Sequence, residues 1–96
     1  MAATPDPLNV SATTRFDKDA KMARKRGKDM ARLVAVVDAL RNRRPLADRH
    51  RDHALSGNWQ GWRDCHVDSD WVLVYRIDEE AGELILGRIG THSDLF

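Results

Sequence analysis

The sequence predicts an α+β domain with elements in the order β-α-α-β-β-β, and three observations support this prediction. An early segment rich in β-branched residues precedes two stretches in which apolar residues recur at helical spacing. Three further segments, separated by short turns, have the apolar patterns of strands. The chain has 96 residues, which suits one compact domain. We therefore expect a two-helix hairpin packed on a small, mostly antiparallel, curved sheet.

The N-terminus is expected to be a flexible leader over residues 1–10, followed by a single domain over residues 11–96. The leader contains Pro5 and Pro7 and shows no apolar periodicity. The segment NVSATTRF, residues 9–16, is rich in β-branched residues and predicts a short first strand that overlaps the end of this leader.

Two helices should follow, joined by the segment KRGKD. For the first, Asp17 is the expected N-cap and Gly27 the stop, with Phe16 and Ala20 on its buried side. For the second, Asp29 is the expected N-cap and Pro45 ends the helical region. The second helix has one apolar stripe at helical spacing, made of Met30, Leu33, Val34, Val37 and Leu40.

The C-terminal half begins with an ordered loop over residues 45–61, where turn residues interrupt any period. Strands are then expected at residues 62–67, 71–77 and 83–89, connected by the turns DSD and DEEAG. The segment WVLVYRI is apolar on both faces, which is typical of a central strand covered by helices on one side.

The composition favours a cytoplasmic protein. No apolar run approaches the ~20 residues that span a bilayer, and the N-terminus lacks the features of a signal peptide. Cys65 is the single cysteine, which excludes an internal disulfide and suits a reducing compartment.

Charge is unevenly distributed along the chain, although the formal net charge is only +1. Residues 15–51 hold thirteen Lys and Arg against five Asp and Glu, whereas residues 52–96 hold three against nine. Such a polarised field can steer a polyanion or hold an acidic partner. Solvated helix faces would produce the same pattern.

Four histidines lie in the second half of the chain: His50, His53, His66 and His92. His66 ends one expected strand and Asp70 begins the next, so the turn should bring the two side chains together. This pair could be purely structural. A metal site is the second possibility, because His50 and His53 have the H-x-x-H spacing of zinc ligands. However, no C-x-x-C or H-E-x-x-H motif accompanies them, and Cys65 and His66 should point to opposite faces, so we expect no metal and no cofactor.

Metal-free acid–base chemistry is the third possibility. Histidine can remove or donate a proton near neutral pH, and RNA brings its own nucleophile, the 2′-OH. The phosphate that gains charge during such a reaction would need a nearby cation, for which Arg63 and Arg88 are available. Several aromatic residues could pack in the core or stack on an unpaired base, namely Trp59, Trp62, Trp71 and Phe96.

Two motifs carry a resemblance to a known family. They are DHALSGNWQGWRDCHVDSDWVLVY, residues 52–75, and GTHSDLF, residues 90–96. With weaker similarity back to about residue 17, the chain resembles the YafQ branch of the RelE/ParE toxin superfamily. The departures are the leader, a slightly longer DEEAG turn, and Ser69 where a proline is common.

The resemblance implies a RelE-like fold and a toxin of a type II toxin–antitoxin system that cleaves mRNA in the ribosomal A site. It assigns the catalytic set to His53, His66, Asp70 and His92, with Trp71 and Phe96 shaping the site. It does not say which histidine is the acid and which the base. His50 matches no family position and is expected to be ordinary surface.

The resemblance also implies partners: a cognate antitoxin, mRNA, and the 70S ribosome with its RNA. Arg88 is a candidate for holding the scissile phosphate. The basic surface expected to face the ribosome or the antitoxin comprises Lys21, Arg24, Lys25, Arg26 and Lys28. The main rival is a non-catalytic ParE-like toxin that binds DNA gyrase, which would have no use for converging histidines.

Overall fold

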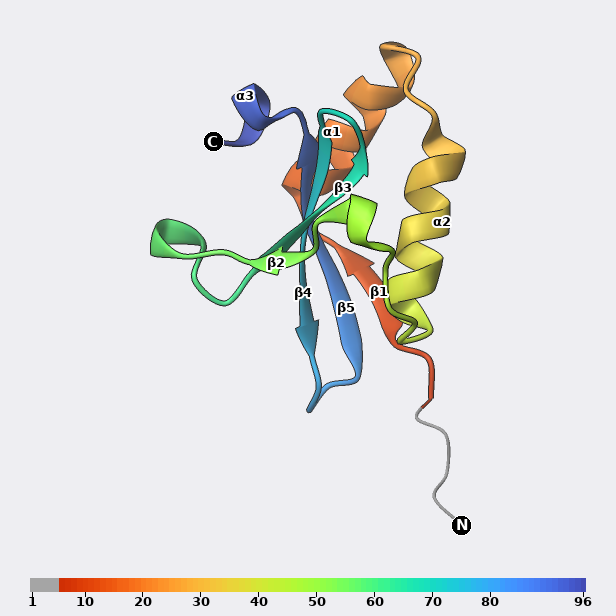
Figure 1. Cartoon of the computed structure of the whole chain (residues 1–96), viewed down its shortest axis with the longest axis vertical. Helices are drawn as coiled ribbons and strands as arrows, with labels where there is room; N and C mark the ends of the chain where they lie inside the picture. The colour runs from red at the N-terminus through yellow and green to blue at the C-terminus, as the bar shows by residue number, and fades with distance from the viewer. Residues whose placement is uncertain (1–5) are drawn as a thin grey trace.

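The computed structural model describes residues 6–96, which form one sheet with helices on both of its sides (Figure 1). The elements in chain order are β1 (Asn9–Ala12), α1 (Thr14–Lys25), α2 (Met30–Arg41), β2 (His53–Ala54), β3 (Arg63–Asp68), β4 (Trp71–Asp78), β5 (Glu83–Gly90) and α3 (His92–Leu95). Two single 3₁₀ turns, η1 (Asp48–His50) and η2 (Gly57–Trp59), flank β2.

The sheet has the strand order β1-β5-β4-β3-β2. β1 runs parallel to β5, and the other neighbours are antiparallel. The predicted α+β class is therefore confirmed, and WVLVYRI is the central strand as expected. β2 is a fifth strand that the loop prediction for residues 45–61 missed, because two residues are too few to show a period.

α1 begins three residues before the predicted N-cap. The cap is Thr13, whose hydroxyl accepts from the backbone N–H of Phe16 at 3.1 Å and donates to the carbonyl of Gly87 at 2.7 Å. The prediction of Asp17 as the cap, and of a strand running to residue 16, is wrong. β-branched residues favour a strand locally, but this tether to β5 sets the start of the helix.

α2 has the predicted N-cap, since the Asp29 carboxylate accepts from the backbone N–H of Ala31 at 3.1 Å. Its buried stripe is Leu33, Val36 and Leu40. Val34, predicted to be buried, is 66% exposed. Met30 and Val37 are partly buried against the same core, so the stripe is as predicted except that Val36 takes the place of Val34.

The predicted leader contributes to the fold in its second half. Leu8 is fully buried, and its backbone N–H donates to the carbonyl of Arg41 at 2.9 Å. The domain therefore begins at Leu8 rather than at residue 11, while residues 1–5 lie outside the described residues.

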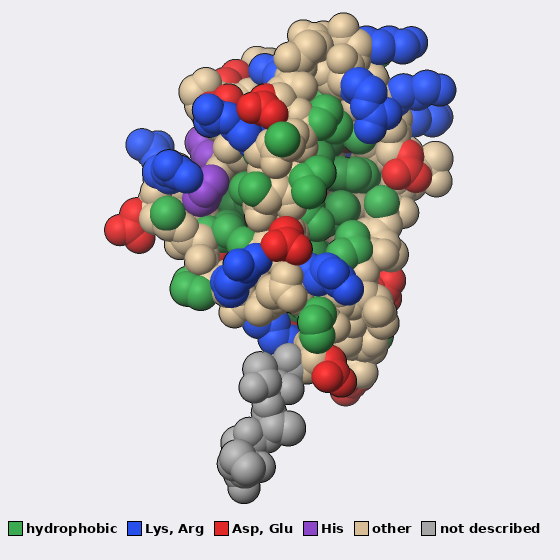
Figure 2. Space-filling view, turned by 90° about the vertical axis from the view of Figure 1, so that its right-hand side faces the viewer, with side chains coloured by type: hydrophobic (Ala, Val, Ile, Leu, Met, Phe, Trp, Pro, Cys, Tyr) green, Lys and Arg blue, Asp and Glu red, His purple; other side chains and the backbone are tan. Residues whose placement is uncertain are grey.

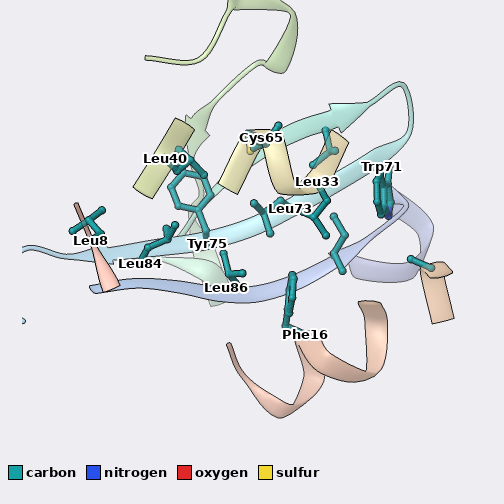
Figure 3. Packing of buried hydrophobic residues seen from close by; sticks show 14 residues of the cluster. Leu8, Phe16, Leu33, Leu40, Cys65, Trp71, Leu73, Tyr75, Leu84 and Leu86 are labelled. Carbon is teal, nitrogen blue, oxygen red and sulfur yellow. The ribbon is translucent and has the colours of Figure 1, made fainter. Parts of the chain in front are cut away.

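Two apolar clusters lie on opposite faces of the sheet. The larger one packs α1 and α2 against one face, with Leu33, Leu73 and Tyr75 near its centre (Figure 3). The smaller one packs α3 and the segment around η2 on the other face, around Val72 and Val74. Among residues 6–96, no helix has the length and apolar character needed to cross a membrane.

Candidate active site

β3 places two polar side chains on the sheet face that α1 and α2 leave open. Asp64 and His66 alternate with Cys65 along the strand, so they share a face while Cys65 points into the helix-side core. Burial raises the pKa of the Cys65 thiol to about 12, so this cysteine stays protonated and does not act as a nucleophile. β2 adds His53 to the same face, as the register partner of Asp64.

α3 brings His92 to the same place. The helix starts with a capping box, in which Thr91 and Asp94 exchange hydrogen bonds between side chain and backbone, each 3.1 Å long. Leu95 anchors it in the smaller core. The ring centroid of His92 then lies 5.2 Å from that of His66.

The partner of Asp70 is His92. Asp70 Oδ1 accepts from the backbone N–H of His92 at 3.1 Å and lies 2.8 Å from His92 Nδ1. The predicted pairing of His66 with Asp70 is therefore wrong. A register irregularity in β3 precedes the turn, and His66 Nδ1 lies 3.3 Å from the carbonyl of Ser69 instead.

The hydrogen-bond partners determine which ring nitrogens are free. His53 Nδ1 lies 2.6 Å from the carbonyl of Arg51. In His66 and His92, as in His53, Nδ1 faces an oxygen that can only accept a hydrogen bond, so Nδ1 carries the hydrogen. Nε2 of each ring is therefore left for a substrate. Hydrogen bonds from His92 lower the pKa of Asp70, so this carboxylate is ionised near neutral pH.

Asp64 lies beneath the histidines and was missed by the sequence analysis. Asp64 is 3% exposed, and its Oδ1 has no hydrogen-bond partner among the described residues. Burial raises the pKa of Asp64, and the charges of His53, His66 and His92 partly offset this effect. All three rings therefore lie within electrostatic reach of one buried carboxyl group. A carboxylate two positions before His66, and so on the same face of the strand as that histidine, was the signal that could have indicated it.

Aromatic rings border the histidines on one side. Phe96 is 56% exposed, with its ring centroid 6.2 Å from His92 and 6.3 Å from Trp59. Trp62 packs edge-on to Trp59 and lies so close to β5 that a Cβ on Gly87 would come within 2.6 Å of its ring. Phe96 is thus placed where a stacking role was predicted, and Trp59 joins it.

Trp71 and Arg88 are not part of this arrangement. Trp71 is 2% exposed and belongs to the helix-side core, so it supports the strand that follows Asp70 and does not line the site. The guanidinium of Arg88 binds the Asp19 carboxylate with contacts of 2.7 and 3.1 Å. Because these donors bind Asp19 of α1, they are not available to the phosphate that Arg88 was predicted to hold.

His50 is more than ordinary surface. It is half-buried, and its Nδ1 lies 2.6 Å from the backbone carbonyl of His66. It also lines a cleft of about 860 Å³ between α2 and the edge of β3, together with Arg32, Arg49 and Arg51. His50 thus supports the strand that carries His66 from outside the histidine cluster.

The predicted basic surface is exposed throughout. It comprises the side chains of Lys21, Arg24, Lys25, Arg26 and Lys28 at the end of α1 and in the turn to α2. Figure 2 shows Lys and Arg side chains gathered at the end of the molecule where Figure 1 places this turn. Arg26 is 3.5 Å from Asp94, but both are well exposed, so this ion pair is weak.

Comparison with known proteins identifies the family. The family model described as bacterial toxin of type II toxin–antitoxin system, YafQ, matches residues 8–96. The chain belongs to this family. Among curated YafQ proteins, the mRNA interferase toxin YafQ of Escherichia coli K12 is 39% identical over 89 residues, covering 92% of this chain and 95% of that protein. The putative toxin YafQ of Haemophilus influenzae is 38% identical, covering 91% and 90%.

Solved structures of YafQ-like toxins share the whole fold. A metal-bound toxin from Helicobacter pylori superposes with a TM-score of 0.88 at 40% identity, covering 93% of this chain and 99% of that one. YafQ in the E. coli DinJ–YafQ complex superposes with a TM-score of 0.84 at 38% identity, covering 94% and 98%. In the described part of the present YafQ-family chain, no three His, Cys, Asp or Glu side chains are arranged to hold a metal ion together.

Proposed function

We propose that this YafQ-family toxin is an mRNA endoribonuclease that cuts messages in the A site of the translating ribosome, without a metal ion. One observation carries the proposal: His53 lies 3.2 Å from the buried carboxyl group of Asp64, the rings of His66 and His92 lie 5.2 Å apart, and the hydrogen bonds of all three histidines leave Nε2 free. RNA needs no nucleophile from the protein, so acid and base groups are sufficient.

The hydrogen bonds suggest which histidine acts as the acid. An ionised Asp70 bonded to Nδ1 of His92 stabilises the positive charge of a doubly protonated ring, so His92 can deliver a proton to the departing 5′ oxygen. His53 holds its Nδ1 proton against a backbone carbonyl and offers Nε2 as the base for the 2′-OH. The ring of His66 lies 5.2 Å from that of His92, so in this proposal its Nε2 stabilises the charge that accumulates on the phosphate.

The aromatic border and the basic surface supply the remaining contacts. The exposed ring of Phe96, backed by Trp59, offers a face on which an unpaired base can stack. The basic surface defined above would contact ribosomal RNA phosphates or an acidic segment of a cognate antitoxin. Both partners would act in the cytoplasm, where translating ribosomes are found.

The test is to map cleavage of a defined message with and without purified ribosomes, with 1,10-phenanthroline present to bind transition metals while the Mg²⁺ that the ribosome requires stays in solution. The wild-type protein should cut ribosome-bound message, and His66→Ala should lower the rate at least ~100-fold and abolish growth arrest. Ser93→Ala is a matched control, because this exposed residue lies next to His92 without belonging to the cluster.

Two outcomes would contradict the proposal. The first is growth arrest that His66→Ala leaves intact while gyrase supercoiling is inhibited, as expected of a ParE-like toxin. The second is cleavage that 1,10-phenanthroline abolishes and added Zn²⁺ restores, which would show that the toxin requires a bound metal ion.

The basic surface has its own test. Reversing the charge of Lys25 and Arg26 to Glu should weaken ribosome or antitoxin binding and leave the fold intact, because both side chains are exposed. When binding is measured at several salt concentrations, the affinity of the variant should depend less on salt than that of the wild type. Unchanged binding to both partners would remove this surface from the proposal.

A further inference from the structure

We infer that Asp64 is a positioning residue for His53: its buried carboxylate stabilises the imidazolium that forms when His53 takes the 2′-OH proton. This inference rests on the proposed function and assigns a role to a residue outside the predicted catalytic set. Asp64 itself does not touch the RNA, because His53 and the neighbouring strands cover it.

The first observation is an acceptor without a donor. Asp64 is 3% exposed, and its Oδ1 makes no hydrogen bond among the described residues. Buried polar atoms in folded proteins nearly always have a partner, since leaving one unpaired is costly. A carboxylate kept in this state indicates a use that the resting protein does not display.

The second observation is the position of the nearest donor. His53 Nδ1 lies 3.2 Å from Asp64 Oδ1 and 2.6 Å from the carbonyl of Arg51. Both neighbours are acceptors, so Nδ1 carries a hydrogen whichever of them it favours. A small rotation of the ring transfers this hydrogen bond from the neutral carbonyl to the carboxylate.

The reaction provides a reason for that rotation. In the proposed step, the 2′-OH proton moves to His53 Nε2 while the 2′ oxygen attacks phosphorus, and the departing 5′ oxygen takes a proton from His92. His53 gains a positive charge in this step. A carboxylate beside Nδ1 stabilises the charged ring more than the neutral one, so its effect is largest in the transition state.

Other charged groups near Asp64 do not provide this contact. The groups that act on it are His53 from β2, His66 from β3, His92 from α3, and Asp52 in the preceding loop. Among these described groups, only His53 comes within ion-pair distance of Asp64, whereas His92 binds Asp70 and Asp52 binds Tyr75 and Arg63. The geometry therefore assigns Asp64 to His53.

The experiment uses Asp64→Asn in the full-length chain, since the amide keeps the shape and removes the charge. Cleavage of ribosome-bound message should show kcat reduced about 100-fold or more, with KM for ribosomes within about threefold of wild type. In NMR spectra of the ¹⁵N-histidine-labelled protein at a pH where His53 is doubly protonated, its Nδ1 proton should move upfield in the variant. Asp19→Asn is the control, because it removes a half-buried carboxylate that binds Arg88 away from the histidines.

The outcomes separate this inference from the proposed function. A kcat within about threefold of wild type, or an unchanged Nδ1 proton resonance, would overturn it. If the protein cuts no RNA, the proposed function fails while the NMR comparison still tests the contact. If Asp64→Asn does not fold, the wild-type spectrum decides: neutral His53 with its hydrogen on Nε2 overturns the inference, and hydrogen on Nδ1 supports it.

Discussion

The two faces of the central strand differ in what their side chains do. On the helix side, Trp71, Leu73 and Tyr75 are at most 2% exposed and pack against α1 and α2. On the other side, Val72 and Val74 are just as buried, but their register partners on β3 are His66 and Asp64. One strand therefore supports a continuous core on one face and a polar site on the other.

The difference shows how a domain of this size accommodates an exposed active site. The helix side buries enough apolar surface to hold the sheet, so the second face can keep costly groups such as Asp64. Stability and chemistry should consequently respond to different residues on adjacent positions of the same strands. The predictions below test that separation, beginning with the largest effect.

Leu73→Ala should lower the free energy of unfolding by about 3 kcal/mol, because it opens a cavity in the fully buried centre of the helix-side core. Urea denaturation followed by circular dichroism measures this change. Cleavage per folded molecule should stay near that of wild type. Val34→Ala, at a 66% exposed position of α2, should change stability little. A loss of activity beyond the loss of folded protein would show that the two faces are coupled.

The turn between β3 and β4 offers a matched pair of carboxylates. Asp70→Asn should lower the cleavage rate about 10- to 100-fold, because it removes the charge that supports a proton on His92. Asp68→Asn should stay within about threefold of wild type, since Asp68 binds the exposed Arg32. Rates on ribosome-bound message under single-turnover conditions distinguish the two. Equal losses in both variants would mean that the turn acts only through its conformation.

Asp64→Asn should raise the free energy of unfolding by about 1 kcal/mol at pH 8, even as it lowers activity, because it relieves a buried, unpaired carboxylate. The sign follows from the pKa of Asp64, which burial raises in the folded state. The folded protein then binds this proton more tightly than the unfolded chain does, so the penalty grows as pH rises from the unfolded pKa through the folded pKa. The stability gain should accordingly vanish below about pH 3.9, the pKa of an unfolded aspartate. Thermal unfolding of both proteins at pH 8 and pH 3 measures this stability gain. A variant less stable than wild type at pH 8 would contradict the prediction.

Local patterns were sufficient for much of the fold. The capped apolar stripe of α2 and the three C-terminal strands were predicted to within a few residues, because their periods depend only on which side faces the core. The start of α1 was not predicted correctly, because the hydroxyl of Thr13 donates to the carbonyl of Gly87, 74 positions away in the sequence. The strand β2 was not predicted, because two residues are too few to show an alternating apolar pattern.

For the site, the residue types were predictable and their pairing was not. His53 and His66 lie on the open face of the sheet, where α3 brings His92, and Asp70 lies in the adjoining turn; their catalytic roles stay a prediction. However, Asp70 binds His92, 22 positions away, and not the nearby His66. Two residues predicted to position the substrate also have other contacts: Trp71 is buried in the helix-side core, and Arg88 binds Asp19.

The sequence by itself determined the α+β order, the apolar faces, the polarised charge and the supply of imidazoles, because each depends on neighbours along the chain. Only the tertiary structure decided which carboxylate serves which histidine. Docking of α3 through Leu95 brings His92 to Asp70, and pairing of β2 with β3 places His53 over Asp64. These contacts join residues that are distant in the chain, and packing of the sheet faces, rather than local preference, holds them together.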